Sequence, residues 1–398
     1  MVHHDIWDYD TPMAPNLMDI TVNGQRRRAI AQTTKQGWMY VFDRATGEPI
    51  WPIEEKPVLQ SDVPGEVTSP TQPIPTRPAP YSQQGLVEAD LIDYTPAIKD
   101  SALKLAQKCR MGPYFIPASP VDGKGKNGPA KYKCSWYAPG ASGGVNIDGG
   151  TAADPETGMI YVGGQSGLST IGVQKDPCSE LNYTSPHNSC GKPGAAAPPK
   201  GYKAPEGESV GRGGAFSRVS AVTTIGAKPA RVGVPPEPGV SILKPAELGG
   251  ITAYDMNSGD KKWWVPNGNL WRDQVSTDPL FAGVKLPRVP ALGGQPEVIT
   301  TKTLVINGTG RSGAPRGGRG ARGGAARGGG RGGGGGIEPK LYAFDKKTGK
   351  EVGAVAIPSV NTAVPMTFMH GGKQYIVFAS GTGGPSGLIA LTLPRTAP

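Results

Sequence analysis

Residues able to transfer protons or to bind a metal ion gather at the start of the chain. The sequence begins MVHHDIWDYDTP, so His3, His4, Asp5, Asp8 and Asp10 lie within eight positions, with aromatic residues between the carboxylates. Imidazole and carboxylate groups are common general acids and bases, and both bind metal ions. Each of these side chains could instead cap a turn or pack against neighbouring groups. Their density still marks the segment as a candidate active site, although chain termini are often poorly ordered.

Short strands are the elements that must hold this segment in place. The runs RRAIAQTT, GWMYVFD, MIYVGG, GITAYD, TLVING, KLYAFD and QYIVFAS are rich in β-branched and aromatic residues and are separated by turn residues. One stretch, residues 91–110, has apolar residues at helical spacing and predicts a short helix. The pattern is that of an all-β chain with long irregular connections.

A repeated turn follows three of these strands. Residues 41–51 read VFDRATGEPIW, residues 253–263 read AYDMNSGDKKW, and residues 343–353 read AFDKKTGKEVG. In each copy the Asp can bond to the turn backbone, and the Gly supplies the left-handed conformation of a bulged hairpin. We expect Trp51 and Trp263, which close the first two copies, to lie between neighbouring sheets. Three copies in the same phase predict four-stranded units, and therefore a β-propeller.

A fourth Asp-x-x-Thr-Gly sequence, residues 154–158, precedes its strand instead of following one. It is therefore out of phase with the three copies above. By itself such a turn is common, and it adds no separate support for the repeat.

The positive charge of the chain is concentrated in one segment. Residues 311–336 hold six arginines and no acidic residue, so removing them lowers the net charge from +10 to +4. Such segments can bind RNA through phosphate contacts and guanidinium stacking. We favour a disordered loop insertion in a hairpin of the final blade, because no aromatic residue interrupts the run and both flanks have strand patterns. A nucleic-acid partner is accordingly not expected.

The four cysteines favour a disulfide over a metal site. Cys109, Cys134, Cys178 and Cys190 form no CxxC pair, which gives a zinc site little support. Cys178 and Cys190 close a short polar loop that suits a disulfide in an oxidising compartment, with free thiols as the alternative. The chain as given contains neither a transmembrane run of 18 apolar residues nor a signal-peptide pattern.

Several blocks of the sequence resemble one known family. These are HHDIWDYDTP, QTTKQGWMYVFDRATGEPIWPIEEKPV, VPGEVTSPTQPIPTRP and, near the end, MTFMHGGKQYIVFASGTG. They resemble the pyrroloquinoline quinone (PQQ)-dependent dehydrogenases, and most closely the membrane-type quinoprotein glucose dehydrogenases with their polyol and quinate relatives. The resemblance implies an eight-bladed propeller with the quinone near its axis. It also implies that residues 1–398 form one partial propeller domain, roughly the second half of the whole.

The resemblance assigns roles to two residues. The catalytic Asp of the HHDxWD motif corresponds to Asp8, and the quinone-contacting Lys corresponds to Lys35 in TTKQG, 27 residues later. Asp8 would take the hydroxyl proton while the alcohol transfers hydride to the quinone, and burial would raise the proton affinity of its carboxyl group. Lys35 would assist with a hydrogen bond that strengthens as charge develops on the accepting oxygen. The family also uses Ca²⁺, and we expect most of its ligands upstream of Met1.

The remaining implications concern substrate, partners and location. The resemblance implies a glucose-like sugar or a polyol as substrate, a quinone or cytochrome as electron acceptor, and the N-terminal half of the propeller as partner. It places the enzyme in the periplasm, with any membrane anchor outside residues 1–398. We expect the chain to be inactive by itself, because one wall of the quinone pocket would be missing.

Some positions depart from the family pattern. Gly163 stands where relatives often carry a cofactor-contacting Asn, and Asp148 stands where they carry a Trp. His370 lies before Gly-Gly-Lys and is interpreted as part of a hairpin turn. The alternative reading is a noncatalytic propeller scaffold that acts through protein contacts. The spacing of Asp8 and Lys35 favours the enzyme, because a scaffold has no need of both residues.

Overall fold

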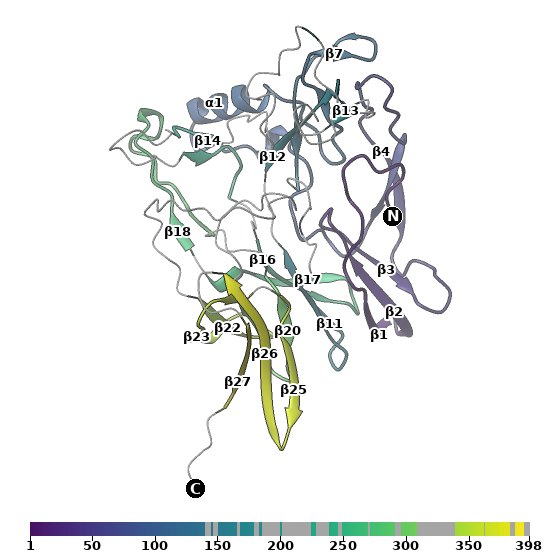
Figure 1. The fold of residues 1–398 in the computed structure, drawn as a ribbon, viewed down its shortest axis with the longest axis vertical. Helices are drawn as coiled ribbons and strands as arrows, with labels where there is room; N and C mark the ends of the chain where they lie inside the picture. The colour runs from purple at the N-terminus through teal and green to yellow at the C-terminus, as the bar shows by residue number, and fades with distance from the viewer. Residues whose placement is uncertain are drawn as a thin grey trace.

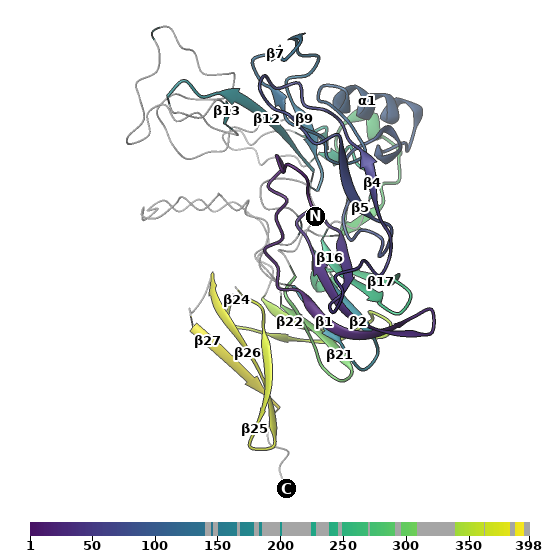
Figure 2. The same cartoon turned by 90° about the vertical axis from the view of Figure 1, so that its right-hand side faces the viewer.

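A computed structural model describes most of the chain (Figures 1 and 2). The residues described are 1–139, 145, 150–164, 168–178, 183–184, 200, 224–227, 239–245, 249–269, 271–290, 296–308, 339–361, 363–382 and 387–393. Antiparallel sheets dominate this part of the chain, as the sequence predicts. No helix among these residues has both the length and the apolar character needed to cross a membrane.

Three antiparallel sheets form consecutive blades. The first blade contains β1 (Asn16–Val22), β2 (Gln25–Thr33) and β3 (Met39–Asp43). The second contains β10 (Thr151–Asp154), β11 (Met159–Gly164), β16 (Gly250–Asp255) and β17 (Asp260–Pro266). The third contains β20 (Val298–Thr300), β21 (Leu304–Gly308), β22 (Lys340–Asp345) and β23 (Glu351–Ala356).

A fourth sheet follows and departs from the repeat. It contains β24 (Val360–Asn361), β25 (Met366–His370), β26 (Lys373–Thr382) and β27 (Gly387–Thr392), with β26 central. A small apolar cluster that includes Leu341 and Phe378 joins it to the third blade, and Figure 2 shows it in yellow at one end of the molecule. His370 ends β25 beside the two-glycine turn, as predicted.

The repeated turns have the predicted geometry. In each copy an Asp carboxylate accepts a hydrogen bond from the amide two residues later, at 2.9–3.1 Å. The glycines Gly47, Gly259 and Gly349 have φ of 79°, 76° and 71°, and the hairpins of the second and third blades carry a register shift, as a bulge requires. The out-of-phase turn at 154–158 joins β10 to β11.

The two closing tryptophans lie between blades, as predicted. A β-carbon placed on Gly259 would stand 3.1 Å from the Trp51 ring, and one placed on Gly349 would stand 2.8 Å from the Trp263 ring. Each indole therefore covers the turn glycine of the following blade. Apolar clusters continue the contact between the first and second blades and between the second and third.

Long connections form a separate layer beside the blades. The α-helix found among its described residues is α1 (Pro96–Ala106), which is capped by Thr95, whose hydroxyl accepts a hydrogen bond from the Ile98 amide at 3.2 Å. The helix is shorter than the predicted 91–110 because Ile92 donates to Ile242 O at 2.9 Å, which keeps this part of the chain extended. The apolar face of α1 packs against Ile225 of β14, and Figure 1 shows this helix away from the blade strands.

The remaining elements are short. The 3-10 turns are η1 (Glu88–Asp90), η2 (Asn267–Asn269) and η3 (Pro279–Phe281). The strands are β4 (Ile53–Pro57), β5 (Thr71–Pro75), β6 (Ser119–Pro120), β7 (Lys124–Gly125), β8 (Gly128–Pro129), β9 (Ser135–Tyr137), β12 (Ser169–Lys175), β13 (Tyr183–Thr184), β14 (Thr224–Ile225), β15 (Val240–Ser241), β18 (Trp271–Asp273) and β19 (Arg288–Pro290).

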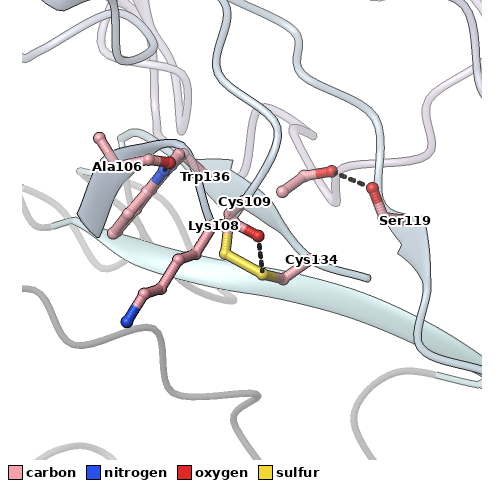
Figure 3. Close-up of a disulfide and its surroundings, with 7 residues drawn as sticks. Ala106, Lys108, Cys109, Ser119, Cys134 and Trp136 are labelled. Atoms are coloured by element: carbon pink, nitrogen blue, oxygen red, sulfur yellow. Dashed lines mark hydrogen bonds between the residues drawn. A yellow bond between two sulfur atoms is a disulfide. The ribbon is translucent and has the colours of Figure 1, made fainter. Parts of the chain in front are cut away.

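A disulfide that the sequence pattern did not reveal joins Cys109 to Cys134 (Figure 3). It ties the chain just after α1 to the residue before β9. Cys178 is buried and disulfide-bonded, while Cys190, its predicted partner, lies outside the described residues.

The Arg/Gly segment 311–336 also lies outside the described residues. Its flanking strands β21 and β22 are antiparallel neighbours, with Gly308 opposite Leu341, so the segment does connect a hairpin. The hairpin belongs to the third blade and not to the final sheet, which corrects the prediction.

Candidate functional site

The side chain of Asp5 holds the turn formed by the residues that follow it. Its two carboxylate oxygens accept hydrogen bonds from the amides of Trp7 and Tyr9, at 2.9 and 2.7 Å. Asp8 lies between these amides with a left-handed backbone, φ 62°. Asp5 therefore shapes the turn on which Asp8 is presented.

Aromatic side chains anchor the same segment in the core. Trp7 and Tyr9 are each 3% exposed and pack against Phe115. The Trp7 indole donates to Ile116 O at 2.9 Å, and the ring of Tyr9 stacks on that of Tyr137 at 5.6 Å. Burial raises the pKa of the Tyr9 and Tyr137 hydroxyls above their usual range, so both remain protonated. Tyr137 uses its proton to donate to Trp7 O.

Asp8 and Asp10 both meet Lys35. The Lys35 ammonium lies 3.1 Å from Asp8 Oδ1 and forms a second ion pair with Asp10 Oδ1. The side chain of Lys35 is 9% exposed, whereas those of Asp8 and Asp10 are 63% and 59% exposed. The structure thus brings together the two residues to which the resemblance gave roles, and it adds Asp10.

The ammonium is held in its charged form. Burial by itself would lower the pKa of Lys35, but hydrogen bonds with Asp10 and Asp8 outweigh that effect, and the pKa is raised. A charged donor of this kind can stabilise negative charge that develops on a bound oxygen.

The exposure of Asp8 differs from the prediction of a partly desolvated carboxylate. Residues 7 and 9 point into the aromatic cluster, so the side chains of Asp8 and Asp10 alternate to the open side. The carboxylate of Asp8 is therefore open to solvent within the described part of the chain. Asp8 thus lacks the predicted burial, but its carboxylate lies close to the buried ammonium of Lys35.

The histidines do not join this site. His3 lies 2.8 Å from Glu55 Oε1, and its backbone exchanges hydrogen bonds with the side chain of Gln72, which ties it to the β4–β5 hairpin. His4 is exposed, with φ 45°. The sequence pattern grouped these residues with Asp8, but the turn at Asp5 separates them from Lys35.

A tight turn after β2 fixes Lys35. The hydroxyl of Thr34 donates to Trp38 O at 2.8 Å, and the hydroxyl of Tyr81 donates to Thr34 O at 2.6 Å. Gly37 has φ 83°, and a β-carbon there would stand 2.8 Å from Ser82 Cβ. The Thr-Thr-Lys-Gln-Gly sequence therefore encodes a closed turn from which only the lysine side chain reaches the carboxylates.

The described residues fit part of a quinone site. Lys35 supplies a buried cation suited to a quinone or carboxylate oxygen. Beside it, the Gln36 amide is 1% exposed and makes no hydrogen bond of normal geometry within the described chain, although it lies near the Tyr40 hydroxyl. For Ca²⁺ the fit is absent: no cluster of three His, Cys, Asp or Glu side chains occurs in the ranges described.

One departure from the family pattern has a steric cause. A β-carbon at Gly163 would overlap the carbonyl oxygen of Pro296 and stand 3.0 Å from Gly150 O. An Asn therefore cannot occupy this position in the present backbone. Asp148, the other departure, lies outside the described residues.

Comparison with known proteins gives consistent matches. A family model described as PQQ, glucose/ethanol/alcohol dehydrogenase, beta-propeller domain, matches residues 1–376. The chain is 27% identical over 390 residues to the quinate/shikimate dehydrogenase (quinone) of Acinetobacter baylyi, covering 96% of this chain and 39% of that protein. It is 27% identical over 384 residues to the glycerol dehydrogenase large subunit of Gluconobacter oxydans, covering 96% and 44%.

Two further matches are shorter or more distant. Over 72 residues the chain is 50% identical to the quinoprotein glucose dehydrogenase of Escherichia coli, covering 18% of this chain and 9% of that protein. Among solved structures it is similar to the quinohemoprotein alcohol dehydrogenase from Comamonas testosteroni, with 17% identity, a TM-score of 0.41, and coverage of 96% and 36%. The chain spans about two fifths of the length of the relatives that it matches throughout.

Proposed function

Because the chain belongs to the PQQ-dependent dehydrogenase family, we propose that it carries the base and the quinone-contacting cation of an enzyme that oxidises a sugar or polyol. The observation that carries this proposal is the buried Lys35 ammonium 3.1 Å from the accessible Asp8 carboxylate. A noncatalytic scaffold gains nothing from a desolvated lysine that faces two exposed carboxylates.

The chemistry divides between the two residues. Asp8 accepts the proton of the substrate hydroxyl, and the carbinol carbon loses its hydrogen as hydride. The quinone, when bound, supplies the two-electron acceptor for that hydride. Lys35 would hold an oxygen of the quinone by a charge-assisted hydrogen bond. Asp10 keeps the lysine charged and directed toward the same opening.

Substrate and location are part of the proposal. The names of the relatives specify quinate or shikimate, glycerol and glucose, all of which carry several hydroxyl groups. We therefore favour a sugar or polyol as substrate, with a quinone as electron acceptor ahead of a cytochrome. The Cys109–Cys134 disulfide supports an oxidising compartment such as the periplasm. A membrane anchor and Ca²⁺ ligands from outside residues 1–398 complete the proposed enzyme.

A further blade is the proposed partner, and the first blade shows where it would pack. Leu17, Ile30 and Phe42 lie opposite one another across β1, β2 and β3 on the face turned away from the second blade. Leu17 is 61% exposed, and the other two are partly exposed. At the equivalent positions of the next two blades, the residues packed on a preceding blade are fully buried: Ile160, Tyr254, Val305 and Phe344.

The turn glycines also show that the first blade lacks, within the described part of the chain, the preceding neighbour that the second and third blades have. Gly259 and Gly349 lie beneath the indoles of preceding blades, whereas no described atom lies within 4 Å of a β-carbon placed on Gly47. The expected occupant is therefore a blade of the same repeat that ends in Trp. The third blade has Gly353 where the second has Trp263, so a second copy of this chain offers no such indole.

Two measurements test these proposals: the activity of residues 1–398 alone, and the activity of the enzyme completed by the proposed further blades. We expect the chain alone to self-associate through the face that carries Leu17, Ile30 and Phe42, and to show no dye-linked polyol oxidation with PQQ and Ca²⁺. Leu17→Lys should reduce the association seen by light scattering. A monodisperse wild-type chain that oxidises glucose or glycerol would contradict the proposed partner.

In the completed enzyme, Asp8→Asn should lower kcat by about 10²–10⁴-fold, because the substrate proton loses its acceptor. PQQ binding, followed by absorbance, should persist. Asp19→Asn, which alters a partly exposed, ion-paired carboxylate of β1, is the matched control and should retain full activity. Near-normal turnover by the Asp8 variant would remove Asp8 from the mechanism and favour the scaffold.

A further inference from the structure

Unusual backbone conformations concentrate around the N-terminal segment. In the described ranges, four non-glycine residues have positive φ, and three of them lie in this segment or against it: His4, Asp8 and Phe115. The fourth, Asn23, lies in the β1–β2 turn. Residues held in this region persist only where their surroundings impose it, and they often mark functional sites.

Two peptide groups define the backbone angles of Asp8, and each is held by a different side chain. The Asp8–Tyr9 peptide donates its N–H to Asp5 Oδ2 at 2.7 Å. The Trp7–Asp8 peptide accepts, at Trp7 O, a hydrogen bond from the Tyr137 hydroxyl. Because φ and ψ of a residue describe the orientation of its two flanking peptides, these two bonds together fix the left-handed turn.

Both holding groups are themselves well anchored. The second oxygen of Asp5 accepts the Trp7 amide at 2.9 Å, so the carboxylate cannot rotate without losing both bonds. Tyr137 ends β9, a strand that starts beside the Cys109–Cys134 disulfide. The neighbouring Trp136 indole donates to Ala106 O at 2.7 Å (Figure 3). The solvent-exposed turn at Asp8 is thus held in place by Asp5 and by the buried residue Tyr137.

We propose that Asp5 and Tyr137 are positioning residues, which hold Asp8 in the left-handed conformation that places its carboxylate against Lys35. As a role in catalysis this rests on the proposed function, whereas the geometric effect does not. A residue with a β-carbon favours negative φ when it is free. Loss of either bond should therefore let the turn relax and move the Asp8 carboxylate away from the ammonium.

The test compares Asp5→Ala and Tyr137→Phe with wild type. Hydrogen exchange of the Trp7 and Tyr9 amides should accelerate at least tenfold in Asp5→Ala. In both variants the titration of Lys35, followed by ¹³Cε NMR, should shift to lower pH, because a hydrogen bond to Asp8 that raises its pKa is lost. Asp5→Asn keeps one acceptor oxygen and should restore part of each effect.

Asp122→Ala is the control, because Asp122 also accepts a turn amide, at 3.0 Å, but lies outside this network. It should leave the Lys35 titration unchanged. In the completed enzyme, Asp5→Ala and Tyr137→Phe should lower kcat by about ten- to a hundredfold through misplacement of the base, with little change in KM.

The outcomes separate the two proposals. Unchanged amide exchange and Lys35 titration in folded variants would overturn the positioning role. If those signals change while the completed wild-type enzyme oxidises no alcohol, the positioning role stands and the proposed function fails. If Asp5→Ala does not fold, Tyr137→Phe decides, because it removes a single hydroxyl group from the buried ring.

Discussion

Two buried lysines of this protein form ion pairs with opposite surroundings. Lys346 and Asp154 are 7% and 6% exposed, and their charged atoms lie 2.6 Å apart. Lys35 is equally buried, but its partners Asp8 and Asp10 are both more than half exposed. In the first pair both side chains are buried, and we call it the closed pair. In the second only the lysine is buried, and we call it the open pair.

The closed pair joins two blades. Asp154 is the last residue of β10, at the hairpin of the second blade, and Lys346 lies in the β22–β23 turn of the third. Lys346 also donates to Thr301 O at 3.3 Å, and its own carbonyl accepts from Trp263 Nε1 at 3.2 Å. These partners satisfy the buried charges, which indicates a role in blade packing. An open pair of the Lys35 kind leaves carboxylate oxygens available to a ligand.

Breaking the closed pair should produce the largest loss of stability. Asp154→Ala leaves the Lys346 charge buried without its partner, and we expect the free energy of unfolding to fall by about 3–5 kcal/mol. Urea denaturation followed by fluorescence would measure this. Asp154→Leu combined with Lys346→Met removes both charges and should recover much of the loss. A single variant as stable as wild type would mean that the pair does not hold the blades together.

Acid should weaken the same contact. Burial alone would raise the pKa of Asp154, but hydrogen bonds with Lys346 and Thr157 outweigh it, so the folded pKa lies below the usual 3.8. A carboxyl group with a lowered folded pKa contributes stability that is complete above its unfolded pKa and is lost as pH falls through the folded value. The difference in unfolding free energy between wild type and Asp154→Asn should therefore shrink below about pH 4. A pH-independent difference would contradict the assignment.

Removing one carboxylate of the open pair should have a small effect on stability. Asp10→Asn leaves Lys35 paired with Asp8, and the carboxylate that it removes is more than half exposed and screened by water, so the loss should be at most about 1 kcal/mol. The unfolding midpoint should stay close to that of wild type, while the Lys35 titration shifts to lower pH. Destabilisation as large as that of Asp154→Ala would erase the distinction between the two pairs.

Deletion of residues 311–336 should have the smallest effect. The flanking strands β21 and β22 pair directly, and each doubling of a flexible loop costs only about 0.6 kcal/mol. We expect the shortened chain to be at least as stable as wild type in urea, and the completed enzyme to keep its activity. Loss of activity with unchanged stability would instead indicate a docking role for the arginines.

The strand pattern and the turns could be predicted because they depend on neighbouring residues. Short runs rich in β-branched and aromatic residues identified β2, β11, β16 and β22 closely, and the spacing of Asp and Gly identified the bulged hairpins. The phase of Trp51 and Trp263 in the repeat was enough to place them between blades. The family resemblance was likewise confirmed, since it rests on contiguous motifs.

Contacts between distant residues could not be predicted in this way. The cysteines 109 and 134 are 25 residues apart with no diagnostic spacing, and Lys346 is 192 residues from Asp154. The sequence also gave no reason to separate His3 from Asp8, or to assign Asp5 to the backbone. These outcomes depend on which surfaces the blades and the connecting layer bring together.

The sequence by itself therefore determined an all-β chain of repeated hairpins with a family motif at Asp8 and Lys35. Local backbone preferences and short-range hydrogen bonds are sufficient for the hairpins, whereas the motif at Asp8 and Lys35 follows from the resemblance to the family. Only the tertiary structure decided that Lys35 is buried while Asp8 and Asp10 remain accessible. The reason is physical: the exposure of a charge depends on what surrounds it, and the turn that carries Lys35 is held by segments far away in the sequence, through hydrogen bonds from Tyr81 to Thr34 O and from Val145 to Lys35 O.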